Sequence, residues 1–309
     1  YKSDADLQAM HAQVPWLLTW DDHEVQNDYA GLKAGEGGPS VADFAVRRAA
    51  AYQAWYEHLP VPATVLTQGI PGLAGAEMRI YRRVDFGRLA SVYMLDGRQY
   101  RDPQVCVPEG GFGSRSMDPA DCPRWGDPAR SMLGIQQENW LAEQLARASP
   151  GWNLLAQETL FGRLDRRAGP GELLWNDSWD GYTAARTRLT DTLRGQRVAN
   201  PVVFGGDIHQ NWVGHVKADY RDPASPSVGV EFCGTSISSR SGGISQLPER
   251  LPENPHFIYA EARHRGYGLA EFTPRRLSVG LRRVDDVTRR DSGVTTLARF
   301  AVQAGRPVL

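Results

Sequence analysis

The sequence lacks a long hydrophobic run, an excess of one charge and, almost entirely, lysine. Its longest apolar stretches, such as 16–18 and 202–204, are far shorter than the roughly 20 residues that a membrane-spanning helix needs. The 35 Lys and Arg balance 36 Asp and Glu, which argues against nucleic-acid binding as the main role. Lysine occurs only at positions 2, 33 and 217, and we attribute this bias to genomic base composition rather than to function.

Cysteine is also scarce. Cys106 and Cys122 bracket a segment rich in glycine and proline, and a disulfide between them would close a loop of about 15 residues and contribute roughly 3 kcal/mol. The alternative is two unrelated thiols. We expect the bridge, with Cys233 as a buried thiol, and therefore an exported protein in an oxidising compartment. The chain begins with Tyr1 and no leader follows, so we expect that a leader has been removed or that the chain is a fragment.

What the 309 residues do contain is a regular alternation of helical and strand patterns. Helical spacing is found near 136–147 and 182–193, and short apolar runs at 89–95, 153–157 and 201–204 indicate buried strands. Strand patterns dominate after residue 212. No repeat or low-complexity linker divides the chain. We therefore predict a single α/β domain over residues 1–309, built of layered sheets with helices outside.

Two polar clusters follow apolar runs that we interpret as buried strands. Residues 21–28 hold five acidic or imidazole groups directly after the run 16–20, and such crowding is costly without a cation. Asp207 and His209 follow the run 201–204, and in extended backbone their side chains would leave on the same face. The alternatives are a solvated acidic turn and a hydrogen-bonded pair at a loop end. Together, the clusters predict a metal site shared between two strand ends.

These residues also resemble a known family. Trp20-Asp21-Asp22-His23-Glu24-Val25, followed by Asn27, is similar to the signature of PhoD-type alkaline phosphatases, a branch of the calcineurin-like metallophosphoesterases. Five further segments match family motifs in the family's order: 96–101, with Gly97 where the family has Thr, and 134–141, 179–182, 206–209 and 254–256. The resemblance covers nearly the whole chain. It implies an α/β fold in which a layered β-sandwich is flanked by helices.

The resemblance implies a set of metal ligands. Asn27, Asp207 and His209 correspond to ligands of the family, and Asp22 is a further candidate, although Asn27 could fill the same metal position. The family uses iron with calcium, and another divalent metal is an alternative. Hard oxygen donors such as Asp22 and Asn27 suit calcium.

Other roles follow from the same comparison. His23 is the candidate proton donor, and Arg98 is the candidate ligand of the non-bridging phosphate oxygens, with a structural salt bridge as the alternative for Arg98. Asp21, Glu24 and Asp28 are expected at the surface or behind the ligands. His215 and His264 are expected to be structural.

The implied function is metal-dependent hydrolysis of small phosphate monoesters or diesters by a metal-activated water. Family members also carry an upstream Ser-Cys motif and a Gly-Asp-Tyr-Ile-Tyr motif that supply metal ligands, and nothing before Trp20 matches them. We therefore expect a catalytic domain that is truncated on its N-terminal side and binds metal weakly. The alternative is a catalytically impaired module of the same fold that binds metal or phosphate. The oligomeric state is left open.

Overall fold

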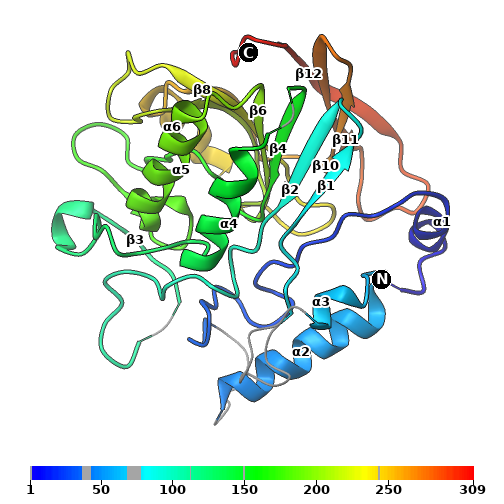
Figure 1. The fold of residues 1–309 in the computed structure, drawn as a ribbon, viewed down its shortest axis with the longest axis horizontal. Coiled ribbons are helices and arrows are strands. Elements are labelled where there is room, and N and C mark those ends of the chain that lie inside the picture. The colour runs from blue at the N-terminus through cyan, green and yellow to red at the C-terminus, as the bar shows by residue number, and fades with distance from the viewer. Residues whose placement is uncertain (1, 37–42, 68–77, 112, 149, 243) are drawn as a thin grey trace.

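The structure is a computed structural model that describes residues 2–36, 43–67, 78–111, 113–148, 150–242 and 244–309. Its first helices are α1 (Ala5–Gln13), α2 (Phe44–His58) and α3 (Thr64–Thr67), which lie to one side of the sheets in Figure 1. Asp43 caps α2 by accepting hydrogen bonds from the amides of Ala45 and Val46. Tyr52 and Trp55 of α2 pack against Trp20, so this helix covers the polar turn that follows Trp20.

A seven-stranded sheet forms the centre of the molecule. Four neighbouring strands run parallel, and antiparallel pairings close both edges. The predicted strands at 89–95, 153–157 and 201–204 are three of the parallel strands, and β2 is buried along its whole length, as expected for a strand covered on both faces. In spatial order the strands are β1 (Arg82–Phe86), β2 (Ala90–Met94), β4 (Trp152–Ala156), β6 (Pro201–Gly205), β8 (Ser227–Cys233), β7 (Asn211–Lys217) and β9 (Phe257–Glu261).

A second, three-stranded antiparallel sheet covers one face of the large sheet. It consists of β10 (Arg265–Phe272), β11 (Arg276–Val284) and β12 (Val294–Gln303). Val92, Val202 and Val230 of the large sheet meet Leu277 and Leu281 of β11 in one buried cluster. This contact between two sheets is the predicted sandwich.

Helices α4 (Ile135–Leu145) and α5 (Thr183–Gly195) cover the opposite face of the large sheet (Figure 1). Their apolar stripes contribute Leu141 and Leu189, which pack against Tyr93, Leu155 and Val203 of the strands. Both helices lie where the helical spacing at 136–147 and 182–193 predicts them. The order of helices, large sheet and small sheet confirms the predicted α/β class.

Short elements connect these layers. They are β3 (Ser116–Met117), which pairs with β5 (Leu174–Trp175), the 3-10 helices Pro119–Asp121, Trp179–Tyr182 and Ile244–Gln246, and α6 (Leu247–Glu253). The predicted disulfide joins Cys106 to Cys122 with 5.9 Å between the Cα atoms, and Cys233 is a buried free thiol. Among the described residues, no helix has the length and apolarity needed to cross a membrane.

One predicted strand is wrong. Residues 16–20 are extended but join no ladder. Because β1 and β4 already pair with β2 on both sides, this segment cannot pair with β2, and it lies across the end of that strand instead. The Thr19 hydroxyl donates to the Leu95 carbonyl at 2.9 Å, just beyond β2. Residues 21–28 therefore reach the strand ends without belonging to the sheet.

Candidate active site

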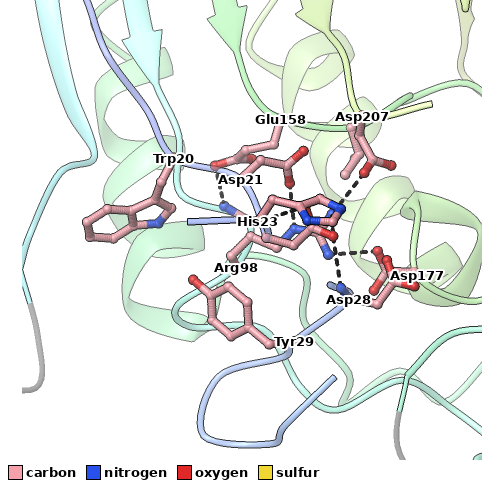
Figure 2. Close-up of polar contacts among 12 residues, drawn as sticks. Trp20, Asp21, His23, Asp28, Tyr29, Arg98, Glu158, Asp177 and Asp207 are labelled. Carbon is pink, nitrogen blue, oxygen red and sulfur yellow. Dashed lines mark hydrogen bonds and ion pairs between the residues drawn. The ribbon is translucent and has the colours of Figure 1, made fainter. Parts of the chain in front are cut away.

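The candidate site lies where the parallel strands end. Asp96 follows β2, Glu158 follows β4 and Asp207 follows β6, so three carboxyl groups meet at one edge of the sheet. Open parallel sheets bind their ligands at this edge. Figure 2 shows Glu158 and Asp207 projecting from the strand ends towards Arg98 and the turn that carries Asp21 and His23.

Asp22 organises the turn that follows Trp20. Its Oδ1 accepts from the amide of His23, and its Oδ2 accepts from the amide of Asp28, both at 2.8 Å. The carbonyl of Asp22 accepts from the amides of Val25 and Gln26. The buried Asp22 carboxylate thus holds both ends of the turn, and the exposed His23 ring lines the cavity beside it.

Three carboxylates gather closely enough to hold a cation. One oxygen each from Asp21, Asp22 and Asp207 lies within 4.8 Å of the others. Asp22 and Asp207 are predicted ligands. Asp21 is expected at the surface or behind the ligands, but it belongs to this cluster. Nothing in the sequence distinguishes Asp21 from its neighbour Asp22 as a candidate ligand.

Arg98 lies at the centre of the acidic residues (Figure 2). Its Nε donates to Asp21 and its Nη1 to Asp177, both at 2.7 Å, and its Nη2 donates to Asp207 at 3.2 Å. The guanidinium is fully buried. The predicted contact of Arg98 with phosphate stays a prediction, and this geometry matches the structural salt bridge that the sequence leaves as the alternative.

Asp177 belongs to no motif or polar cluster that the sequence pattern predicts. It is buried, and it accepts from Arg98 at 2.7 Å, from Arg101 at 2.9 Å and from Gln104 at 2.6 Å. Burial alone would raise the pKa of Asp177, but Arg98 and Arg101 outweigh it and hold that pKa below its usual value. Asp177 therefore carries a fixed negative charge that orients Arg98.

The other acids of the site are electrostatically crowded. Burial raises the pKa of Asp207 well above its usual value, and the neighbouring Asp21 adds to the effect. Burial also raises the pKa of Asp21, and burial together with Asp177 raises the pKa of Asp28 to about 6. These shifts express burial first and repulsion among the acids second, and Arg98 offsets them only in part. A cation among these carboxylates would relieve the rest, and an all-oxygen donor set suits a hard cation such as calcium.

His209 is not part of the close group of three carboxylates. Asp207 and His209 have φ values of +67° and +58°, so the backbone here is left-handed rather than extended. The premise that the two side chains share one strand face is therefore wrong. The His209 Nδ1 pairs with the Arg240 carbonyl at 2.9 Å, and its role as a ligand stays a prediction.

Asn27 lines the same cavity as the three carboxylates. Its amide nitrogen donates to Asp28 Oδ2 at 2.9 Å, and the Ser114 hydroxyl donates to the same oxygen at 2.5 Å. This contact fixes the orientation of the Asn27 side chain, and a ligand role for its amide oxygen stays a prediction. Asp28 is expected either at the surface or behind the ligands. It is buried, which agrees with the place behind the ligands.

The two remaining histidines of interest are structural. His215 accepts from the backbone amide of Leu309 at 3.1 Å. His264 pairs with Glu261 at 2.9 Å and with Arg283 at 2.9 Å. Neither lines the cavity of about 1040 Å³ that contains the three carboxylates.

Known proteins match nearly the whole chain in sequence and in fold. A family model described as PhoD-like phosphatase matches residues 1–281. Alkaline phosphatase D of Bacillus subtilis is 39% identical over 306 residues, which are 98% of this chain and 50% of that protein. A solved structure of PhoD superposes with a TM-score of 0.85 at 39% identity, covering 98% of this chain and 55% of that one. The chain thus spans about half the length of the relatives that it matches.

Proposed function

Because the chain belongs to the PhoD-like phosphatase family, we propose that it hydrolyses phosphate esters in the cavity beside Asp21, Asp22 and Asp207. The observation that carries this proposal is the close group of three carboxylates at the strand ends. Repulsion among them favours a bound cation, and the relative's name states phosphatase activity. Residues 1–309 act as one catalytic domain, since the site combines residues as distant in sequence as Asp21 and Asp207.

The proposed metal ligands are Asp21, Asp22 and Asp207, with Asn27 and His209 completing the donor set. The carboxylates and the Asn27 amide oxygen suit calcium, and the His209 imidazole suits iron or another transition metal. When bound, such cations polarise the phosphoryl group and lower the pKa of water. Iron with calcium is the set that the family resemblance favours, and another divalent metal is the alternative.

Two residues then act on the substrate and on the ligands. His23 is the proposed proton donor to the leaving alkoxide, supported by its exposed ring at the cavity wall. Arg98 is the proposed positioning residue, supported by its contacts to Asp21 and Asp207, which orient both carboxylates. The substrate is a small phosphate ester, and the disulfide supports export to an oxidising compartment.

The proposal is tested with a chromogenic phosphomonoester and the matching diester. We expect hydrolysis of at least one when iron and calcium are supplied, and its loss in the presence of a chelator. Restoration by a single metal would identify that metal. A chain that binds metal but hydrolyses neither ester under any metal condition would instead support the impaired binding module.

A further inference from the structure

The cavity beside the acidic residues is also lined by basic side chains, which we call the basic wall. Arg115, Arg166 and Arg250 line the same 1040 Å³ cavity as Asp21 and Asp207. Arg115 immediately precedes β3, Arg166 lies in the loop after β4, and Arg250 is on α6. Three segments that are distant in sequence thus bring cationic side chains to one surface.

None of these three arginines forms an ion pair with a carboxylate of the described residues. By contrast, Arg163 pairs with Glu172 at 2.8 Å, and Arg167 pairs with Asp118 at 3.2 Å. Within the described part of the chain, the Arg166 side chain donates one hydrogen bond, to the Ser116 hydroxyl at 3.2 Å. Its guanidinium stacks 3.7 Å above the centre of the Trp175 ring, which fixes its plane.

Several buried donors of this wall have no acceptor. The Nε atoms of Arg166 and Arg250 and the indole nitrogen of Trp175 are buried without a hydrogen-bond partner among the described residues. All three groups are donors, and a buried donor without an acceptor is costly. An acceptor from outside the described residues, such as an oxygen of a bound anion, would satisfy these donors.

Arg166 and Arg250 also repel each other. Burial, and then the nearby Arg250, lower the pKa of Arg166 to about 10, so both remain charged at neutral pH. Asp180, and then Asp207 and Asp28, act on the pKa of Arg166 in the opposite direction, so Arg166 lies within electrostatic reach of the acidic residues of the site. Neither arginine forms a direct ion pair with a carboxylate of the described residues, and a bound anion would stabilise two such adjacent cations.

We propose that Arg166 and Arg250, with Arg115 at the rim, form a subsite for a second anionic group of the substrate. The scissile phosphate lies at the acidic cluster, and a further phosphate or carboxylate of the same molecule lies on the basic wall. This inference rests on the proposed esterase function. It names the substrate class as phosphate esters that carry at least two anionic groups.

The test compares two substrates that differ by one anionic group, adenosine 5′-monophosphate and adenosine 3′,5′-bisphosphate. With the metal-loaded full chain, Arg166→Gln and Arg250→Gln should each lower kcat/KM for the bisphosphate about tenfold to a hundredfold, because each removes a charge-assisted contact. The effect on the monophosphate should be less than about threefold. The matched control is Arg167→Gln, which alters a neighbouring arginine that is paired with Asp118 and is not part of the cavity wall.

A binding measurement tests the proposed anion subsite independently of the proposed esterase activity. Pyrophosphate should bind the full chain in the presence of chelator, and Arg166→Gln should weaken it at least about tenfold, whereas Arg167→Gln should not. If the wild type binds pyrophosphate in this way but hydrolyses no ester, the proposed function fails and the subsite stands. If esters are hydrolysed but Arg166→Gln and Arg250→Gln affect both nucleotides equally, or leave pyrophosphate binding unchanged, the subsite is wrong and the function stands.

The variants also need a check on folding, because Arg166 packs on Trp175. Arg250→Gln provides this check because it should fold normally. Arg250 lies on the short helix α6, and its side chain has no hydrogen bond to another described residue. A selective loss of the bisphosphate in Arg250→Gln, at an unchanged melting temperature, supports the subsite even if Arg166→Gln folds poorly. Equal loss of both nucleotides at that melting temperature would contradict it.

Discussion

At the scale of single residues, Asp207 takes part in both the carboxylate cluster and the Arg98 contact. We expect Asp207→Asn to lower metal affinity at least about tenfold and turnover about a hundredfold, because it removes an anionic ligand. Stability should change little, because burial already raises the pKa of Asp207. Metal titration by calorimetry and ester hydrolysis measure the two effects.

The control for this variant is Asp219→Asn, which changes an exposed aspartate beyond β7. His209→Ala is measured in the same assays. The sequence predicts His209 as a ligand although it lies outside the carboxylate cluster, and the metal affinity of this variant decides whether it is one. Normal metal affinity and turnover in Asp207→Asn would remove Asp207 from the ligand set.

Glu158 is a buried acid at the strand ends that the proposed chemistry does not use. Its Oε1 accepts from the amide of Gly97 at 2.9 Å and lies 3.1 Å from the Thr19 hydroxyl oxygen, and its Oε2 has no partner in the described residues. A Cβ at residue 97 would lie 2.8 Å from that oxygen. A threonine at this position would therefore require the buried Glu158 carboxyl to shift, which is a physical reason why glycine suits it.

Glu158 should make stability depend on pH. Burial, and then Asp96, raise the pKa of Glu158 from 4.5 to about 8. The folded protein therefore holds a proton that the unfolded chain has lost, and this group's contribution is present below pH 4.5 and is lost as pH rises through about 8. Urea unfolding should show the wild type losing stability relative to Glu158→Gln between pH 5 and 8. The exposed Glu143→Gln should show no such trend, and a flat difference for Glu158→Gln would contradict the assignment.

Local sequence pattern predicts only part of the site. Asp22 and Asp207 are predictable because each belongs to a polar cluster that directly follows an apolar run. Asp177 is not, because its role depends on Arg98, 79 residues away along the chain. Nor does the sequence reveal the left-handed backbone at Asp207 and His209, since neither residue is glycine.

At the scale of elements, the predicted helices and most strands match because their apolar spacing is regular, as in α4, α5, β4 and β6. Segment 16–20 has the same apolar character as a strand but pairs with none, because β2, the strand whose end it contacts, is already paired on both sides. Local sequence pattern also cannot predict the order of the strands in the sheet. For example, β7 lies between β8 and β9, an arrangement set by crossovers rather than by composition.

The Cys106–Cys122 disulfide connects the loop before β3 to the residue that follows the 3-10 helix Pro119–Asp121. Cys122 packs with Val105 and Leu174, and the Asn176 side chain donates to the Val105 carbonyl at 2.8 Å. We expect reduction to lower the free energy of unfolding by about 2–4 kcal/mol, because the unfolded chain gains freedom. Urea unfolding with and without reductant measures this change.

The control for the reduction experiment is the Cys106→Ser/Cys122→Ser variant, whose stability should not respond to reductant. Cys233 is present in both proteins, so its thiol cancels from the comparison. An equal response in the variant would assign the effect of reductant to something other than the bridge. A wild type that does not respond would contradict a stabilising role for the disulfide.

At the scale of the whole molecule, the acidic cluster exists only in the folded state. Asp21 and Asp22 lie in the turn after Trp20 and Asp207 follows β6, so the unfolded chain cannot hold these carboxylates within 4.8 Å. A cation that binds the cluster therefore binds the native state alone. Its binding free energy adds to the stability of the entire fold.

We accordingly expect divalent metal to raise the melting temperature. At about 100 times its dissociation constant, a single bound ion contributes about 2.7 kcal/mol, which corresponds to a shift of roughly 3–6 °C for a chain of this size. Calcium titration followed by thermal unfolding measures the shift, with potassium chloride at matched ionic strength as the control for screening. Asp207→Asn should lose most of it. An equal shift in wild type and Asp207→Asn would mean that calcium stabilises the protein from another surface, and the carboxylates at the strand ends would then have to be relieved by Arg98 alone.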